Sequence, residues 1–252
     1  SAFNAPLKVL SGITNATEFS TPYRGKLFGA LTIDAGASVA VGTSNSYSLE
    51  VYGIVTNNGT VSGFGEFILS GTALVNNNTI STYYLRFNSS INLSGGGSFT
   101  STDIVIDIND TVKILSNITI NPVTIFSIRS GGVLNPNTFV FTIIRGEFEV
   151  LAGGTVFNSG AFRTEGTVSL DLRSGSAFNS PLNIISGITT VADISSPYKA
   201  RLYGPVTIDN GASLKIGYSL SYSLEVYGNV TNNGSITSST GAELIFTSGA
   251  HT

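Results

Sequence analysis

Cysteine, methionine and tryptophan are absent from this 252-residue chain, and only 11% of its residues are charged. Without cysteine the chain cannot form disulfides or use a thiol nucleophile. The single histidine, His251, lies one residue from the C-terminus, so neither a histidine-based triad nor a zinc site with the usual ligands is expected. These absences remove the common routes to hydrolytic and zinc chemistry, and we expect no catalytic residues and no cofactor.

Two kinds of partner are also disfavoured by what is missing. Twelve Lys and Arg residues are scattered among fifteen Asp and Glu residues, so the basic surface that binds nucleic acid is absent. No apolar run reaches the roughly 18 residues that a membrane-spanning helix needs. We therefore expect neither nucleic-acid binding nor membrane insertion by this segment.

The sequence is rich in short runs in which apolar residues alternate with polar ones. Examples are SVAVG at residues 38–42, LEVYG at 49–53 and VSLDL at 168–172. Each run ends near glycine, asparagine or serine or beside another turn residue, which is typical of a strand followed by a turn. Helical spacing is nearly absent, so the chain is predicted to be all-β.

A long internal repeat organises the chain. Residues 1–63 return at 176–238 without a gap, and about 57% of these positions are identical. The block SYSLEVYG at 46–53 recurs unchanged at 221–228. We predict a first repeat at residues 1–175 and a partial second repeat at 176–252, continuous with the first, in a natural protein that extends beyond both ends.

Two all-β architectures fit this pattern. One is a right-handed parallel β-helix, or β-solenoid, of about twelve coils, in which each coil of roughly 20 residues stacks on the last. Its sharp corners suit the Asn-Gly pairs, because both residue types tolerate left-handed backbone, and asparagine side chains can form ladders between coils. The alternative is a set of antiparallel β-sandwich domains, in which Asn-Gly pairs would form hairpin turns.

Several segments resemble the coils of bacterial surface β-helices. LTIDAGASVAVG at residues 31–42 and VTNNGTVS at 55–62 look like the repeats of haemagglutinin-type adhesins and autotransporter passenger domains. The resemblance is spread over most of the chain and carries no diagnostic motif. It implies an extracellular or cell-surface location and a role in adhesion or scaffolding, without catalytic residues.

The best cluster of acids for a hard cation is Asp103, Asp107 and Asp110 in the segment TDIVIDINDT. Their carboxylates suit calcium, and Asp103 and Asp107 point to one face of an extended strand. One strand cannot supply six ligands, so turn capping or solvation is the competing interpretation. The sequence marks these residues as weak metal candidates only.

Two further features concern carbohydrate. Tyr83 and Tyr84 could stack against sugars, although packing at corners or between coils, with a hydroxyl in water, is the competing interpretation. Asn58 and Asn233 stand in Asn-x-Ser/Thr sequences that correspond across the repeat, so they are the candidate glycan attachment sites in a secreted protein.

We expect a non-catalytic structural or adhesive repeat module of a stalk, surface layer or fibre. Its main partner would be itself, through head-to-tail repeats or filament subunits, because the end coils of a solenoid are unpaired strand edges. A carbohydrate-binding adhesin that contacts surface glycans is the alternative. A polysaccharide-active β-helix enzyme is the third and weakest hypothesis.

Overall fold

A computed structural model describes residues 2–16, 23–157, 160–195, 197–218, 221–248 and 250–252. In these residues it contains thirty-three strands and no helix. The strands pair in parallel, each with a strand about one coil before or after it in the chain. The prediction of a stacked β-solenoid is therefore confirmed, and the antiparallel sandwich is excluded.

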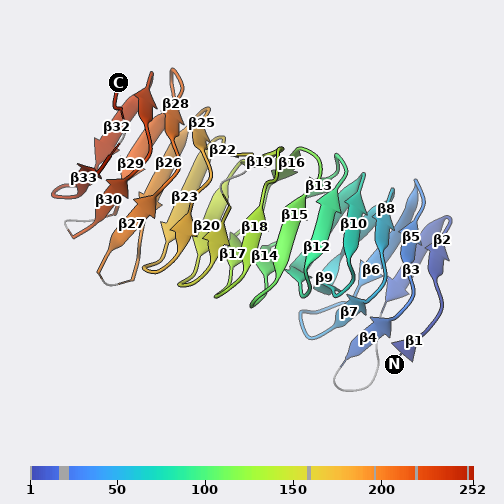
Figure 1. The fold of residues 1–252 in the computed structure, drawn as a ribbon. Coiled ribbons are helices and arrows are strands. Elements are labelled where there is room, and N and C mark those ends of the chain that lie inside the picture. Colours follow the sequence, from blue (N-terminus) through green and yellow to red (C-terminus); the bar gives the residue numbers. More distant parts are fainter. Residues whose placement is uncertain (1, 17–22, 158–159, 196, 219–220, 249) are drawn as a thin grey trace.

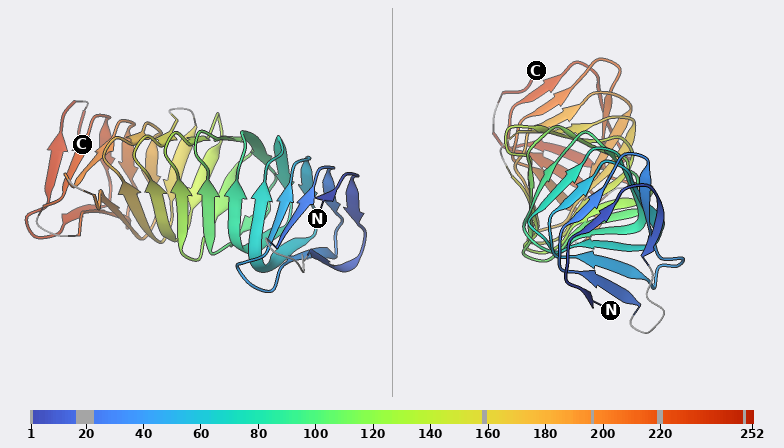
Figure 2. Two further views of the ribbon diagram at one scale, coloured as in Figure 1. Left: turned by 90° about the horizontal axis from the view of Figure 1, so that it is seen from below. Right: turned by 90° about the vertical axis from the view of Figure 1, so that its right-hand side faces the viewer.

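The molecule is elongated, with the two termini at opposite ends and the strands lying across the long axis (Figures 1 and 2). Each coil contributes strands to three faces in a fixed order, which we number I, II and III. Face I is a separate sheet with one strand in each of twelve coils, which gives about eleven turns and agrees with the predicted twelve coils.

The strands of face I, in chain order, are β2 (Leu7–Val9), β5 (Leu31–Ile33), β8 (Val55–Asn57), β10 (Ala73–Asn76), β12 (Ile91–Ser94), β15 (Thr111–Ile114), β18 (Val133–Asn135), β21 (Thr155–Val156), β24 (Ala177–Phe178), β27 (Lys199–Leu202), β30 (Ser223–Val226) and β33 (Glu243–Phe246). Two long strands, β9 (Thr60–Leu69) and β11 (Thr79–Phe87), run around the corner between faces II and III and join them into one sheet.

Besides β9 and β11, the strands of face II are β3 (Gly12–Ala16), β6 (Ala37–Val41), β13 (Ser98–Phe99), β16 (Ile118–Ile120), β19 (Val140–Ile143), β22 (Ala161–Thr164), β25 (Leu182–Ile184), β28 (Val206–Ile208) and β31 (Val230–Asn232). Those of face III are β1 (Ala2–Phe3), β4 (Arg24–Leu27), β7 (Ser48–Val51), β14 (Asp103–Ile106), β17 (Ile125–Ile128), β20 (Gly146–Val150), β23 (Thr167–Leu172), β26 (Ile188–Ala192), β29 (Ser213–Ile216) and β32 (Ser235–Ser238).

One continuous hydrophobic core runs along the inside of the coils. Because side chains alternate along a strand, one set of each alternating run points inward, and the in-register stacking places like residues above one another. Buried phenylalanines form a chain of ring contacts at 4.6 to 5.5 Å in the second half of the molecule. Burying each ring contributes on the order of 2–3 kcal/mol, so the core is a main source of stability. The rings are Phe126, Phe141, Phe148, Phe162 and Phe178.

The turns keep the same backbone in both copies of the repeat. Tyr23 and Tyr198, which correspond, have positive φ angles of 54° and 61°. A positive φ is uncommon for a residue with a side chain, so its recurrence shows that the local sequence determines the turn. Gly59 and its counterpart Gly234 are also required, because an added Cβ would lie only 2.2 to 2.3 Å from a backbone oxygen of the preceding coil.

The two copies nevertheless occupy different faces. Val9 lies in β2 on face I, whereas its counterpart Ile184 lies in β25 on face II. Eight pairing steps lead along face II from Thr14, which is on the same coil as Val9, to Ile184. The 175-residue repeat therefore contains eight coils and one additional face, a third of a turn.

The same shift applies to every strand of the duplicated segment. Strand β6 on face II returns as β29 on face III, and β7 on face III returns as β30 on face I. The sequence thus specifies a strand and its inward residues without specifying which side of the solenoid the strand forms. Both sheets pass through the predicted repeat boundary after residue 175 without a break, since β21 pairs with β24 in one sheet, and β22 and β23 pair with β25 and β26 in the other.

Candidate functional site

A row of ion pairs on face III holds most of the charge in the first part of the chain. The buried carboxylate of Glu50 contacts Arg24 at 3.0 Å and accepts a hydrogen bond from Ser70 Oγ at 2.8 Å. Arg86 bridges two coils by contacting Glu66 at 2.6 Å and Asp107 at 3.1 Å. Each of these pairs joins opposite charges on adjacent coils, so it attracts one coil to the next.

The second copy repeats one of these arrangements on another face. Glu225 on face I contacts Arg201 at 2.8 Å and Lys199 at 3.5 Å. The hydrogen bond from Arg201 is the main reason that the pKa of Glu225 is lowered. In the first copy the positions of arginine and lysine are exchanged around Glu50, which shows that the shared carboxylate accepts either order.

The three metal candidates occupy different environments. Asp107 lies between Arg86 and Arg129, each within 3.1 Å of a carboxylate oxygen. Burial acts to raise its pKa, but the Ile108 amide and the two guanidinium groups outweigh this effect and lower it. Asp110 has a pKa raised by burial and by the charge of Asp107.

Asp103 differs from both of its neighbours. One of its carboxylate oxygens is buried without a hydrogen-bond partner, and burial raises its pKa above the ordinary 3.8. Across the described residues, no group of three or more histidine, aspartate or glutamate side chains is placed to hold a metal ion. The geometry therefore assigns Asp107 to an ion-pair network and gives no support to a cation at the three aspartates.

The corner between faces II and III carries exposed apolar side chains around a surface cavity. Phe64 is 68% exposed and Val123 is 57% exposed, and both line a surface cavity of about 440 Å³ together with Tyr83. The ring of Tyr84 meets that of Tyr83 edge-on at 4.7 Å. We call Phe64, Tyr83, Tyr84 and Val123 the aromatic corner.

Polar groups border the aromatic corner on both sides. Tyr84 is in register with Glu66 on the preceding coil and with Asp103 on the following one. Threonine and serine side chains complete the cavity, including Ser81, Thr82, Thr100 and Thr102. The structure thus places the rings of the aromatic corner beside hydroxyl groups and carboxylates.

Sequence reasoning missed Phe64 and Val123. Neither has a partner in a motif, and each looks like an ordinary strand or loop residue. Their position beside Tyr83 can be recognised only when the local coil length is known. In this part of the chain one coil spans 19 residues, as the bonded pair Asn57 and Asn76 shows. Phe64 and Tyr83 are also 19 residues apart.

A second group of acids lies further along face III. Asp171 is 1% exposed, and its pKa is raised mainly by burial, although Arg173 lies 2.7 Å from it. The same arginine contacts Glu149 of the adjacent strand β20 at 2.5 Å. Burial and the charges of Asp171 and Glu149 raise the pKa of Glu147. Arg173 forms ion pairs with both Asp171 and Glu149. If the protein were a polysaccharide-active enzyme, its acid–base pair would therefore have to include Glu147.

The asparagine corners form side-chain ladders, as predicted. The buried Asn57 donates to Asn76 Oδ1 at 2.7 Å, and Asn76 donates to the Ser98 carbonyl at 3.1 Å. The neighbouring Asn58 accepts a hydrogen bond from Asn77 at 2.8 Å and is half-buried, whereas its counterpart Asn233 is exposed. The two predicted glycan attachment sites therefore differ in access, and Asn233 is the more accessible.

Comparisons of this chain with models of protein families, with curated proteins and with solved structures found no match. In the described residues, no helix is long and apolar enough to cross a membrane.

Two neighbouring aspartates should respond to pH in opposite ways. Because the folded state raises the pKa of Asp103, the chain loses stability as the pH rises from about 3.8 through the folded pKa. Asp103→Asn should therefore raise the free energy of unfolding by about 1 kcal/mol at neutral pH and have little effect below the ordinary pKa. Urea denaturation at several pH values measures this difference.

Asp107→Asn is the matched control with the reverse sign. The lowered pKa of Asp107 stabilises the fold above the ordinary value of 3.8, and this stability is lost as the pH falls through the folded pKa. The variant should lower the free energy of unfolding at neutral pH by about 1–3 kcal/mol, and this cost should shrink in acid. Equal behaviour of the two variants would contradict the assigned environments.

Proposed function

We propose that this protein is a non-catalytic structural repeat module of an extracellular or cell-surface stalk, layer or fibre, built by the end-to-end stacking of coils. The observation that carries the proposal is the continuity of the core and of both sheets across the repeat boundary. A module of this kind transmits force through backbone hydrogen bonds that run along its long axis.

The distribution of charge supports a structural role. Several acidic side chains of face III, namely Glu66, Asp107 and Glu149, are held by arginines from adjacent coils, and Arg201 holds Glu225 on face I in the same way. These pairs act between coils, where they fix the stacking register. The proposed location outside the cell depends on the resemblance of the coils to those of bacterial surface β-helices.

Electron microscopy of native material, with an antibody raised against this chain, tests the proposal. We expect the label at regular intervals along filaments, stalks or a surface layer outside the cell. Label confined to compact single particles within the cell would overturn both the role and the location.

The aromatic corner favours carbohydrate binding as a second function. Three rings and a cavity of about 440 Å³ lie together on one edge of the solenoid, bordered by hydroxyl groups. The proposal is a shallow site in which a sugar ring stacks on Tyr83 or Phe64. Such a site would add adhesion to the structural role without changing the fold.

A glycan array probed with the intact chain identifies any sugar that binds. Tyr83→Ala should then weaken binding at least about fivefold, because stacking on a ring contributes on the order of 1 kcal/mol or more. Tyr203→Ala is the control, since Tyr203 is 40% exposed and stacks on Tyr227 but lies outside the aromatic corner. Equal loss in both variants, or no binding by the parent chain, would remove this second function.

A further inference from the structure

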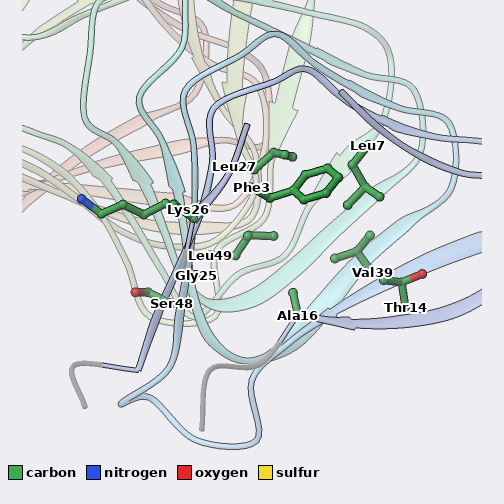
Figure 3. A pocket seen from close by; sticks show the side chains of 11 residues that line it. Phe3, Leu7, Thr14, Ala16, Gly25, Lys26, Leu27, Val39, Ser48 and Leu49 are labelled. Atoms are coloured by element: carbon green, nitrogen blue, oxygen red, sulfur yellow. The ribbon is translucent and has the colours of Figure 1, made fainter. Parts of the chain in front are cut away.

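The N-terminal end of the solenoid opens into its core. A cavity of about 360 Å³ is lined mainly by apolar side chains from the first three coils, among them Phe3, Leu7, Leu27 and Leu49. Figure 3 shows these side chains around a common space, while the ammonium group of Lys26 points away from it. Among the residues that the structure describes, strands β1, β2 and β3 each pair on one side only, with β4, β5 and β6.

The chain contains a second copy of this same end, and there it is covered. Phe3 is 51% exposed, whereas its counterpart Phe178 is fully buried. The half-buried Thr14 likewise corresponds to Thr189, which is 0% exposed. The covering strands are β21, β22 and β23, which pair with β24, β25 and β26.

The contacts across this internal junction are specific. The ring of Phe162 lies 5.1 Å from that of Phe178, and the hydroxyls of Thr164 and Thr189 are 2.7 Å apart. Leu170 is in register with Val191. The open end has the same residues at three of these positions. Phe3, Leu7 and Thr14 correspond to Phe178, Leu182 and Thr189 of the covered copy.

We propose that the N-terminal end of this solenoid is a docking surface for a coil with the sequence of residues 154–175, carried by another repeat of this same protein. The proposal rests on the structural function above and names the partner segment. In the docked state β21, β22 and β23 of the other repeat cover β1, β2 and β3, Phe162 packs on Phe3, and Thr164 meets Thr14.

Joining repeats in this way rotates each one by a third of a turn relative to the last. The internal junction places β24, the counterpart of β1, on face I, whereas β1 lies on face III. A surface group of one repeat therefore appears on the next face in the following repeat and returns to its original side after three repeats. An array assembled from this unit presents the same residues in three directions.

Three residues that line the open cavity are smaller than their counterparts in the covered copy. Ala16 corresponds to Val191, Gly25 to Ala200 and Val39 to Leu214. The docked junction would bury less apolar surface than the internal one, so it should be somewhat weaker. An added Cβ at Gly25 would meet its neighbours only at 3.8 Å or more, so Gly25→Ala fits without displacing them.

The test is a chain in which a copy of residues 154–175 is fused directly before Ser1 of the complete protein. Amide exchange in β2 and β3 should slow at least about tenfold relative to the parent chain, because the added coil pairs with their free edge. The control carries Phe162→Asp and Leu170→Asp in the added copy only. Equal protection by the control, or no protection by the intact added coil, would overturn the proposal.

The register is tested with a disulfide, because the chain has no cysteine of its own. Adjacent strands place paired residues about 5 Å apart, which suits a disulfide. Ser169→Cys in the added coil should crosslink to Asn15→Cys, as the internal pair Ser169→Cys and Thr190→Cys should in the unextended chain. A crosslink at the internal pair alone would contradict the docking register.

Small-angle scattering on the parent chain separates this proposal from the structural function. If the parent chain is elongated but the chain with the added coil shows neither slower amide exchange nor the crosslink, the docking surface is refuted and the stacked-coil role is not. A compact particle would refute both.

Discussion

In-register parallel hydrogen bonding between successive coils is the interaction on which the rest of the structure depends. It places each residue beside the one that occupies the same point of the next coil. Leu31 pairs with Val55, and Leu74 with both Val55 and Leu93, so a continuous apolar row forms along face I. The same constraint brings Asn57 to Asn76 and brings Arg86 between Glu66 and Asp107. Core, ladders and ion pairs are consequences of one stacking rule.

Much of this fold could be predicted from the sequence because the stacking rule has local signals. Alternating runs indicate strands, and the recurring Asn-Asn-Gly segments indicate corners whose amide side chains can bond to one another. The ladder from Asn57 to Asn76 follows from those signals. The metal interpretation of Asp103, Asp107 and Asp110 had no such basis, and the arginines that occupy Asp107 come from other coils.

Other features depend on coil length, which varies along the chain. Leu7 pairs with Leu31, 24 residues on, whereas Val55 pairs with Leu74, only 19 residues on. The shorter coils are those in which β9 and β11 pass the corner without a break, with Gly63 lying so close to Val41 that a Cβ would clash. Because these lengths decide which residues of later coils lie beside Phe64, sequence spacing alone does not reveal the aromatic corner.

The shift by one face has the same origin. A repeat of constant sequence need not contain a whole number of coils, since each strand requires only a neighbour above and below it. Equivalent segments therefore build face I in one copy and face II in the next without loss of burial, as Val9 and Ile184 show. The packing of inward residues and the geometry of the turns explain why the two copies keep similar sequences. That similarity does not determine the direction in which a surface group points.

The most direct test of the stacking rule is the set of through-space contacts between backbone protons, measured by nuclear magnetic resonance on the isotope-labelled chain. The account predicts contacts between Thr32 and Thr56, which lie one coil apart in parallel register on β5 and β8. Contacts that instead join β5 to β6 as an antiparallel hairpin would contradict it.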